Sequence, residues 1–243
     1  MNKTNNYQLT IVIPVFNETD NINRIYEAVH SYFQQCPVSA CLLFVDDGST
    51  DDSLQKIQQV CERTESFFYI SLEKNSGISA ALKAGIDHTM SPYVGYMDAD
   101  LQTDVRDFDI LLKHITKYKL VTGVRVARQD SMFKRIQSFV ANRFRSWITH
   151  DGVTDTGCPL KLMQTDYAKR IPFFTGMHRF IPALILLEEG GSYLEVPVRH
   201  YPRIAGVSKF NLRNRIWNAL VDCMAYKWMS VRYITYAIRK TNL

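Results

Sequence analysis

Residues 94–104 read VGYMDADLQTD, an apolar run that ends in three carboxylates and one amide. The apolar part is typical of a buried strand, and the acids begin where that strand would end. In an extended or gently turning segment, Asp98, Asp100 and Gln102 point to the same side. Such oxygen ligands suit Mg²⁺ or Mn²⁺, and substrate phosphates usually complete the coordination shell of these ions. A lone DxD would instead favour a helix start capped by Asp98 or Asp100.

Apolar runs and helical patterns alternate over about the first 100 residues. The runs that predict buried strands cover residues 9–16, 40–47, 67–75 and 92–102. This alternation is the pattern of a Rossmann-like, mostly parallel α/β sheet flanked by helices. Beyond Asp104 the pattern loosens, and we expect helices near 105–118 and 132–150 and a shorter strand near 193–200. Ligands of such sheets bind at the carboxyl ends of the strands, where the polar clusters of this chain fall.

Two further polar clusters accompany the DxD. Asp46 and Asp47 precede a Gly-Ser-Thr turn, where two adjacent carboxylates would repel a phosphate but would suit a base N–H or ribose hydroxyls. The cluster also lacks the glycines of a phosphate-binding loop. Pro14, Asn17 and Glu18 form the rim of the first strand. Each cluster alone would be explained by a plain turn, but together they predict a nucleotide and a divalent ion at one edge.

The composition is that of an ordinary globular protein. The 243 residues are 46% hydrophobic and 22% charged, enough for one large domain or two small ones. No run of about 18 apolar residues predicts a membrane-spanning helix, and the first residues lack a signal-peptide pattern. The five cysteines contain no CxxC pair, so neither a zinc site nor a disulfide framework is indicated. We therefore expect a reduced, cytoplasmic setting.

Positive charge gathers at the end of the chain. Between Arg199 and Leu243, nine Lys and Arg accompany a single acid, Asp222, which favours an anionic surface or ligand. Residues 211–243 and 133–148 both combine apolar and aromatic stripes with basic borders, as helices in a membrane interface do. Packing of the last helix on protein is the equally open alternative. Since no nucleic-acid-binding motif accompanies the charge, we expect no nucleic-acid partner.

Taken together, these motifs resemble a known family. The segments TIVIPVFNETDNI (10–22), FVDDGSTDDSL (44–54) and the run from Glu73 to Asp104 are similar to family 2 glycosyltransferases of GT-A fold. Within that family they resemble the dolichyl- and polyprenyl-phosphate mannose and glucose synthases. The resemblance resumes at DTGCPLKLM (155–163) and at residues 195–211. It implies a GT-A catalytic domain over 1–210, followed by a basic amphipathic helical segment over 211–243.

The resemblance also implies roles for individual residues. Those matching nucleotide-sugar-binding positions are Pro14, Asn17, Glu18, Asp46, Asp47, Asp98 and Arg203. Those matching metal ligands are Asp98, Asp100 and Gln102. Those matching catalytic positions, including basic residues expected near the phosphates, are Asp100, Arg125, Asp155, Arg203 and Lys209.

The implied activity is metal-dependent and inverting. It moves a sugar from GDP-mannose or a UDP-hexose to polyprenyl or dolichyl phosphate, with Mg²⁺ or Mn²⁺ as cofactor. We expect the chain to lie on the cytoplasmic face of a membrane, as a homo-oligomer or beside a separate membrane subunit. A phosphate acceptor is already anionic and needs no strong base. The basic pair His178-Arg179, where many hydroxyl-specific relatives carry acids, favours such an acceptor.

Two alternatives stay open at the level of sequence. The first is transfer to a hydroxyl of a saccharide or lipid, which requires a general base, for which Asp155 is the candidate. The second is a non-catalytic subunit that binds a nucleotide-sugar, against which the intact DxD and Gln102 argue.

Overall fold

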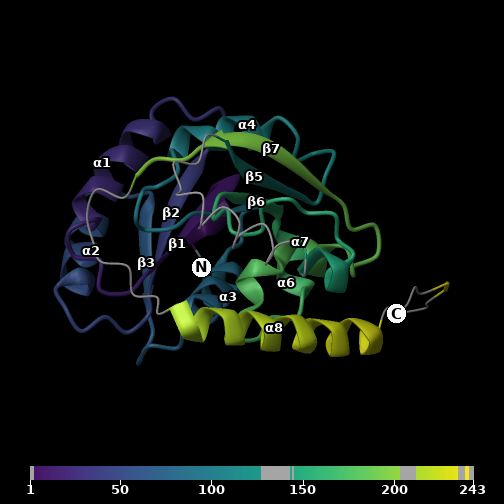
Figure 1. Ribbon diagram of the computed structural model, residues 1–243. Helices are drawn as coiled ribbons and strands as arrows, with labels where there is room; N and C mark the ends of the chain where they lie inside the picture. Colours follow the sequence, from purple (N-terminus) through teal and green to yellow (C-terminus); the bar gives the residue numbers. More distant parts are fainter. Residues whose placement is uncertain (1–2, 127–142, 144, 203–211, 235–238, 241–243) are drawn as a thin grey trace.

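A seven-stranded sheet forms the centre of the computed structural model, which describes residues 3–126, 143, 145–202, 212–234 and 239–240 (Figure 1). The strand order is β3-β2-β1-β4-β6-β5-β7. Only β6 runs antiparallel to its neighbours, β4 and β5; every other neighbouring pair of this sheet is parallel. The strands are β1 (Leu9–Val15), β2 (Ala40–Asp46), β3 (Phe67–Ser71), β4 (Tyr93–Tyr96), β5 (Leu120–Val126), β6 (Lys161–Gln164) and β7 (Tyr193–Arg199).

Helices cover both faces of this sheet. The α-helices are α1 (Ile22–Phe33), α2 (Ser53–Glu62), α3 (Ile78–His88), α4 (Phe108–Leu112), α6 (Thr165–Arg170), α7 (Ile181–Ile185) and α8 (Leu212–Arg232). The 3-10 turns are η1 (Lys3–Asn6), η2 (Val105–Asp107) and η3 (Met177–Arg179). Because side chains alternate along a strand, Ile11 and Ile13 of β1 face the core under α1, α2 and α4. Val12 faces the core under α3, α6, α7 and α8. The predicted α/β architecture is therefore confirmed.

The second half of the sheet differs from the sequence expectation. Neither β5 nor β6 is predicted, and the helix expected over 105–118 consists of η2 and α4, which end at Leu112. β6 has four residues and begins with a fully buried lysine, Lys161, so it lacks a long apolar run. The strand expected near 193–200 is present as β7.

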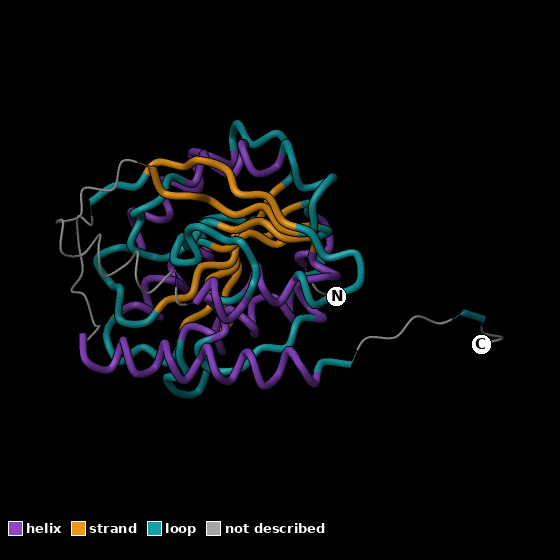
Figure 2. The backbone as a smooth tube through the Cα atoms, turned by 45° about the vertical axis from the view of Figure 1, so that its right-hand side comes forward, coloured by secondary structure: helices purple, strands orange, loops and turns teal. Residues whose placement is uncertain are grey.

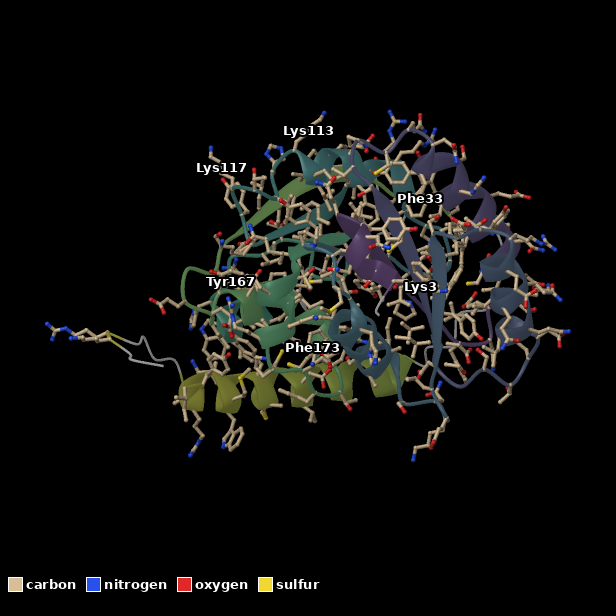
Figure 3. The ribbon with its side chains drawn as sticks, turned by 180° about the vertical axis from the view of Figure 1, so that it is seen from behind. Lys3, Phe33, Lys113, Lys117, Tyr167 and Phe173 are labelled. Atoms are coloured by element: carbon tan, nitrogen blue, oxygen red, sulfur yellow. The ribbon has the colours of Figure 1, made fainter. Side chains whose placement is uncertain are left out.

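The last helix, α8, lies along one side of the molecule (Figures 1 and 2). Its inner face packs on α7 and η3 through Cys223 and Tyr226, and the Tyr226 ring stacks on Phe180 at a centroid distance of 5.6 Å. Figure 3 shows Phe173 beside this helix, whereas Lys113 and Lys117 point outward from the far end of the body. The outer face carries a stripe of exposed apolar side chains: Val221, Met224, Trp228 and Val231, continued by Ile234. Within the described parts of the chain, no helix combines the length and apolarity needed to cross a membrane.

Candidate functional site

One edge of the sheet collects the polar residues that the sequence singles out. Because β1, β2, β4, β5 and β7 are mutually parallel, their carboxyl ends meet at this edge. The reversed strand β6 begins there, so the loop that precedes it, residues 154–160, also reaches this edge. The site therefore draws on segments from both halves of the chain. Two of the predicted site residues, Arg203 and Lys209, and most of segment 133–148 lie outside the described residues.

The DxD forms a tight turn directly after β4. Leu101 adopts a positive φ of 53°, which reverses the chain between Asp100 and Gln102. The Asp100 carboxylate accepts a hydrogen bond from the Gln102 amide at 3.1 Å, and Asp98 accepts one from the Tyr96 hydroxyl at 2.7 Å. The third acid of the stretch, Asp104, belongs elsewhere. It caps η2 and pairs with Arg106 at 2.6 Å.

The electrostatics of this turn favour a cation. The pKa of Asp98 is raised to about 6, by burial first and by the nearby charge of Asp100 second, against the opposing effects of the Tyr96 hydrogen bond, Lys161 and Arg125. Asp100 itself is 7% exposed. Two crowded carboxylates and an amide oxygen are hard donors, which suit Mg²⁺ or Mn²⁺. Among the described residues no group of three His, Cys, Asp or Glu side chains is placed to hold a metal, so a bound ion would need phosphate oxygens as well.

The acid pair Asp46-Asp47, at the end of β2, accepts hydrogen bonds from nearby backbone amides. Asp47 is buried and accepts hydrogen bonds from the Ser76 and Gly77 amides, both at 2.8 Å, which fixes the loop before α3. Asp46 accepts from the Ser49 amide at 3.2 Å and from the Ser71 hydroxyl at 2.9 Å. Both predicted nucleotide-binding acids therefore shape the rim of the site through internal hydrogen bonds.

The polar residues at the end of β1, Asn17 and Glu18, lie beside the turn that follows Asp46-Asp47, and hydrogen bonds join the two segments. Asn17 has a positive φ of 51°. Its side-chain oxygen accepts from the Thr50 backbone amide at 2.7 Å, and its backbone amide donates to the Ser49 hydroxyl at 3.0 Å. Glu18 accepts from Asn21 at 2.7 Å. Pro14 stands on β1 itself, beside Val45 of β2. The structure thus brings the first two predicted clusters together as one connected rim.

A buried ion pair lies at the end of β5. The Arg125 guanidinium donates to both carboxylate oxygens of Asp155, from Nε at 2.8 Å and from Nη2 at 2.7 Å. The Arg125 backbone amide adds a third bond at 3.1 Å. Lys161, at the start of β6, is 1% exposed, donates to the Cys158 carbonyl and lies 5.8 Å from the centroid of the Tyr96 ring. Both Lys161 and Arg125 act on the DxD by lowering the pKa of Asp98, while burial lowers the pKa of Lys161 itself.

The pair His178-Arg179 is not a pair of cations. The pKa of His178 is lowered to about 3, by burial first and by the charges of Arg179 and Lys161 second. The imidazole is therefore neutral near pH 7, and its Nδ1 lies 2.8 Å from the Ser79 hydroxyl. The expectation that both residues attract an anionic acceptor is wrong for His178, because its position under α3 prevents protonation.

Sequence reasoning missed three residues of this region: Tyr96, Lys161 and Glu195. Tyr96 stands two positions before Asp98, so in an extended strand both side chains lie on the same face and could have been predicted to contact each other. Lys161 stands between leucines in LKLM, and a lysine inside an apolar run is a signal of a buried cation with a partner. Glu195, in YLEVPV, carries no such signal, because its partners are backbone amides of a distant loop.

Comparison with known proteins identifies related sequences. The sequence model described as "Glycosyl transferase family 2" matches residues 10–178. The chain is 32% identical over 223 residues to the dodecaprenyl-phosphate galacturonate synthase of Rhizobium johnstonii, covering 90% of this chain and 66% of that protein. It is 29% identical over 216 residues to the undecaprenyl-phosphate 4-deoxy-4-formamido-L-arabinose transferase of Edwardsiella ictaluri, covering 88% and 66%. The chain thus spans about two thirds of the length of these curated relatives.

Solved structures share the architecture. A mannosyltransferase from Pyrobaculum calidifontis, in complex with GDP-Man and Mn²⁺, superposes with a TM-score of 0.67 at 18% identity, covering 95% of this chain and 66% of that one. At this identity the likeness concerns the fold.

Proposed function

The chain belongs to glycosyl transferase family 2 and has the GT-A fold, and on that premise we propose that it transfers a sugar from a nucleotide-sugar to polyprenyl phosphate, with inversion at the anomeric carbon. Polyprenyl-phosphate sugar transfer is named in the two curated relatives above. The observation that carries the proposal is the DxD turn after β4, backed by two buried cations, Arg125 and Lys161. A diphosphate leaving group and an anionic acceptor need that distribution of charge.

The residues of the turn fit a divalent ion. Asp98, Asp100 and Gln102 would hold Mg²⁺ or Mn²⁺, which, when bound, neutralises the negative charge that develops on the leaving diphosphate. The Asp47 hydrogen bonds to the Ser76 and Gly77 amides keep the donor side of the rim in place before the nucleotide arrives. Arg203 and Lys209 lie outside the described residues and keep in this proposal the phosphate-binding role that the family resemblance implies. Tyr201, two residues before Arg203, exchanges hydrogen bonds with Gln102 at 2.8 and 3.3 Å.

A phosphate acceptor needs no general base from the protein. A lipid phosphate is anionic near pH 7, because its second pKa is about 6, so its oxygen attacks without losing a proton to the protein. The Asp155 carboxylate, the candidate base for a hydroxyl acceptor, is occupied on both oxygens by Arg125. This engagement supports a phosphate acceptor over a saccharide hydroxyl.

The outer face of α8 supports a membrane location. Trp228 is 66% exposed and Val231 74% exposed, and the Arg232 guanidinium lies 5.3 Å from the centre of the Trp228 ring. An aromatic and aliphatic stripe with Lys227 and Arg232 beside it fits an anionic membrane surface, where each nearby cation contributes about 1 kcal/mol. We place this face on the cytoplasmic leaflet, which agrees with five cysteines that form no disulfide.

A transfer assay tests the proposed function. The purified chain is given radiolabelled UDP- and GDP-sugars in turn, with Mn²⁺ or Mg²⁺, with and without a short polyprenyl phosphate in detergent. Label is expected in the lipid fraction only when metal and lipid phosphate are both present. Label that moves to a saccharide or to neutral lipid instead would establish a hydroxyl acceptor, and donor binding without turnover would establish a non-catalytic subunit.

A further inference from the structure

A short loop, residues 154–157, lies just before β6 and makes hydrogen bonds to β5 and β7. Its Asp155 pairs with Arg125 of β5, and the two side chains are only 9% and 14% exposed. An arginine side chain is long and has several rotatable bonds, so a guanidinium that must act on a phosphate has to be held in one orientation. The two-pronged pairing with Asp155 supplies that orientation for Arg125.

The loop is itself held by Glu195 of β7. One carboxylate oxygen of Glu195 accepts from the amides of Thr154 at 2.9 Å and Asp155 at 3.1 Å. The other oxygen accepts from the Thr154 hydroxyl at 2.8 Å. Since β7 pairs directly with β5, with Glu195 opposite Thr122, the carboxylate that fixes the loop and the strand that carries Arg125 form one rigid unit.

Gly157 completes the arrangement by leaving room for the guanidinium. A Cβ atom built on Gly157 would stand 2.8 Å from Arg125 Nη2 and 3.6 Å from Asp155 Oδ1. The Arg125 head therefore lies against bare backbone, and its place depends on the loop from two sides.

We propose that Glu195 is a positioning residue for sugar transfer, which acts through the backbone of residues 154–155 to fix Asp155 and, through Asp155, the Arg125 guanidinium. This inference rests on the proposed function above. It assigns Asp155 the task of holding a cation, in place of accepting a proton. Arg125 is then set before the substrate binds, so no reorganisation is needed when charge moves to the phosphate oxygens.

Steady-state kinetics of Glu195→Gln and Thr154→Val test the proposal. A glutamine presents a single acceptor oxygen and cannot accept from all three donors. We expect kcat to fall about 10- to 100-fold for Glu195→Gln, and less for Thr154→Val, with KM for the donor little changed. The matched control is Tyr193→Phe on the same strand, which removes a 2.7 Å bond to the Asp151 carbonyl and leaves Asp155 untouched. This control is expected to keep the wild-type kcat.

A double-mutant cycle separates positioning from a merely structural role. If Glu195 acts through Arg125, then Glu195→Gln in an Arg125→Met background should change kcat less than about two-fold. Independent, multiplying losses would overturn the proposal, as would a folded Glu195→Gln protein with wild-type kcat. Should Glu195→Gln fail to fold, Thr154→Val takes its place, since it removes the hydroxyl bond to Glu195 while Arg125 and Asp155 are unchanged; its loss of kcat should likewise disappear in the Arg125→Met background.

A spectroscopic measurement makes the test independent of activity. The Arg125 Nε–H signal in a ¹H–¹⁵N spectrum, assigned by its loss in Arg125→Met, should exchange slowly with solvent in the wild type and rapidly in Glu195→Gln. Equal exchange in both proteins would refute the positioning role even if turnover were lost. If the wild type shows slow exchange but transfers no sugar to lipid phosphate, the proposed function fails while the positioning of Arg125 stands.

Discussion

The hydroxyl of Tyr96 donates a 2.7 Å hydrogen bond to the Asp98 carboxylate, so the last residue of β4 orients the first acid of the DxD. Partners of this kind fix the rotamer of a metal ligand, and their loss typically weakens metal binding by about 10- to 100-fold. We expect Tyr96→Phe to bind Mn²⁺ at least about ten times more weakly, as measured by calorimetry in the presence of a nucleoside diphosphate. Tyr69→Phe, on β3, should bind Mn²⁺ as the wild type does; equal affinities for all three proteins would remove the assigned role of Tyr96.

Asp100→Ala should abolish metal-dependent transfer while the fold survives. The substitution removes one of two crowded carboxylates, so it relieves repulsion at the turn and leaves the ion with only one carboxylate, Asp98. We expect turnover with Mn²⁺ to fall by about 100-fold or more, with no loss of melting temperature. Asp104→Ala is the matched control, because Asp104 pairs with Arg106 instead. A wild-type rate in Asp100→Ala would remove the metal assignment.

His178 should make the protein less stable in mild acid. Its pKa is about 3 when folded, from burial first and neighbouring charge second, against an ordinary value near 6.5. Between these values the unfolded chain binds a proton that the folded chain does not. The contribution of His178 to the free energy of unfolding is therefore fully present above about pH 6.5 and is lost as the pH falls toward 3. His178→Gln should decline less over pH 7.5 to 5 in urea titrations. Parallel curves for the two proteins would contradict the buried, neutral imidazole.

A charge on the outer stripe of α8 should release the protein from membranes. Trp228→Glu places a carboxylate where the proposal puts an anionic surface, so both apolar burial and electrostatic attraction are lost. Co-sedimentation with vesicles of phosphatidylglycerol and phosphatidylcholine should fall at least about five-fold, with the melting temperature in solution unchanged. Met90→Glu, an exposed methionine outside α8, serves as the control. A wild-type protein that does not sediment, but forms dimers that Trp228→Glu disrupts, would assign the stripe to a second copy.

Gly176→Ala should loosen the packing of α8. Gly176 has a φ of 90°, and an added Cβ would clash with the carboxylate of Asp222 on the helix. Backbone strain and displacement of Asp222 together should lower the free energy of unfolding by about 1–3 kcal/mol, as measured in urea. The neighbouring Thr175→Ala is an exposed, matched change that should stay within about 0.5 kcal/mol of wild type. A fully stable Gly176→Ala would mean that α8 can move without cost.

The first half of the fold was predictable because its strands lie in apolar runs bounded by turn residues. β1 and β2 are seven-residue runs whose side chains are nearly all buried, so periodicity identifies them directly. The family, the α/β class and the position of the DxD followed and are confirmed. β6 escaped prediction because a four-residue strand that begins with Lys161 has no distinctive period. The domain boundary at 210 and the roles of the individual site residues stay predictions.

The contacts within the site depend on distances that one sequence does not contain. Asp47 is satisfied by amides 29 and 30 residues away, and Glu195 by amides 41 and 40 residues away, so only folding reveals that these carboxylates hold loops. The state of His178 likewise depends on burial by α3 and on a lysine in β6.

The reversed strand β6 sets a fixed spacing within the site. It is hydrogen-bonded on one side to β4, which ends in the DxD, and on the other to β5, which ends at Arg125. With neighbouring strands about 4.8 Å apart, the end of β4 that carries the DxD and the end of β5 that carries Arg125 are separated by two strand spacings, roughly 10 Å. That span is a property of backbone hydrogen bonds. Substitutions in the surrounding loops would therefore leave this spacing between the DxD and Arg125 unchanged.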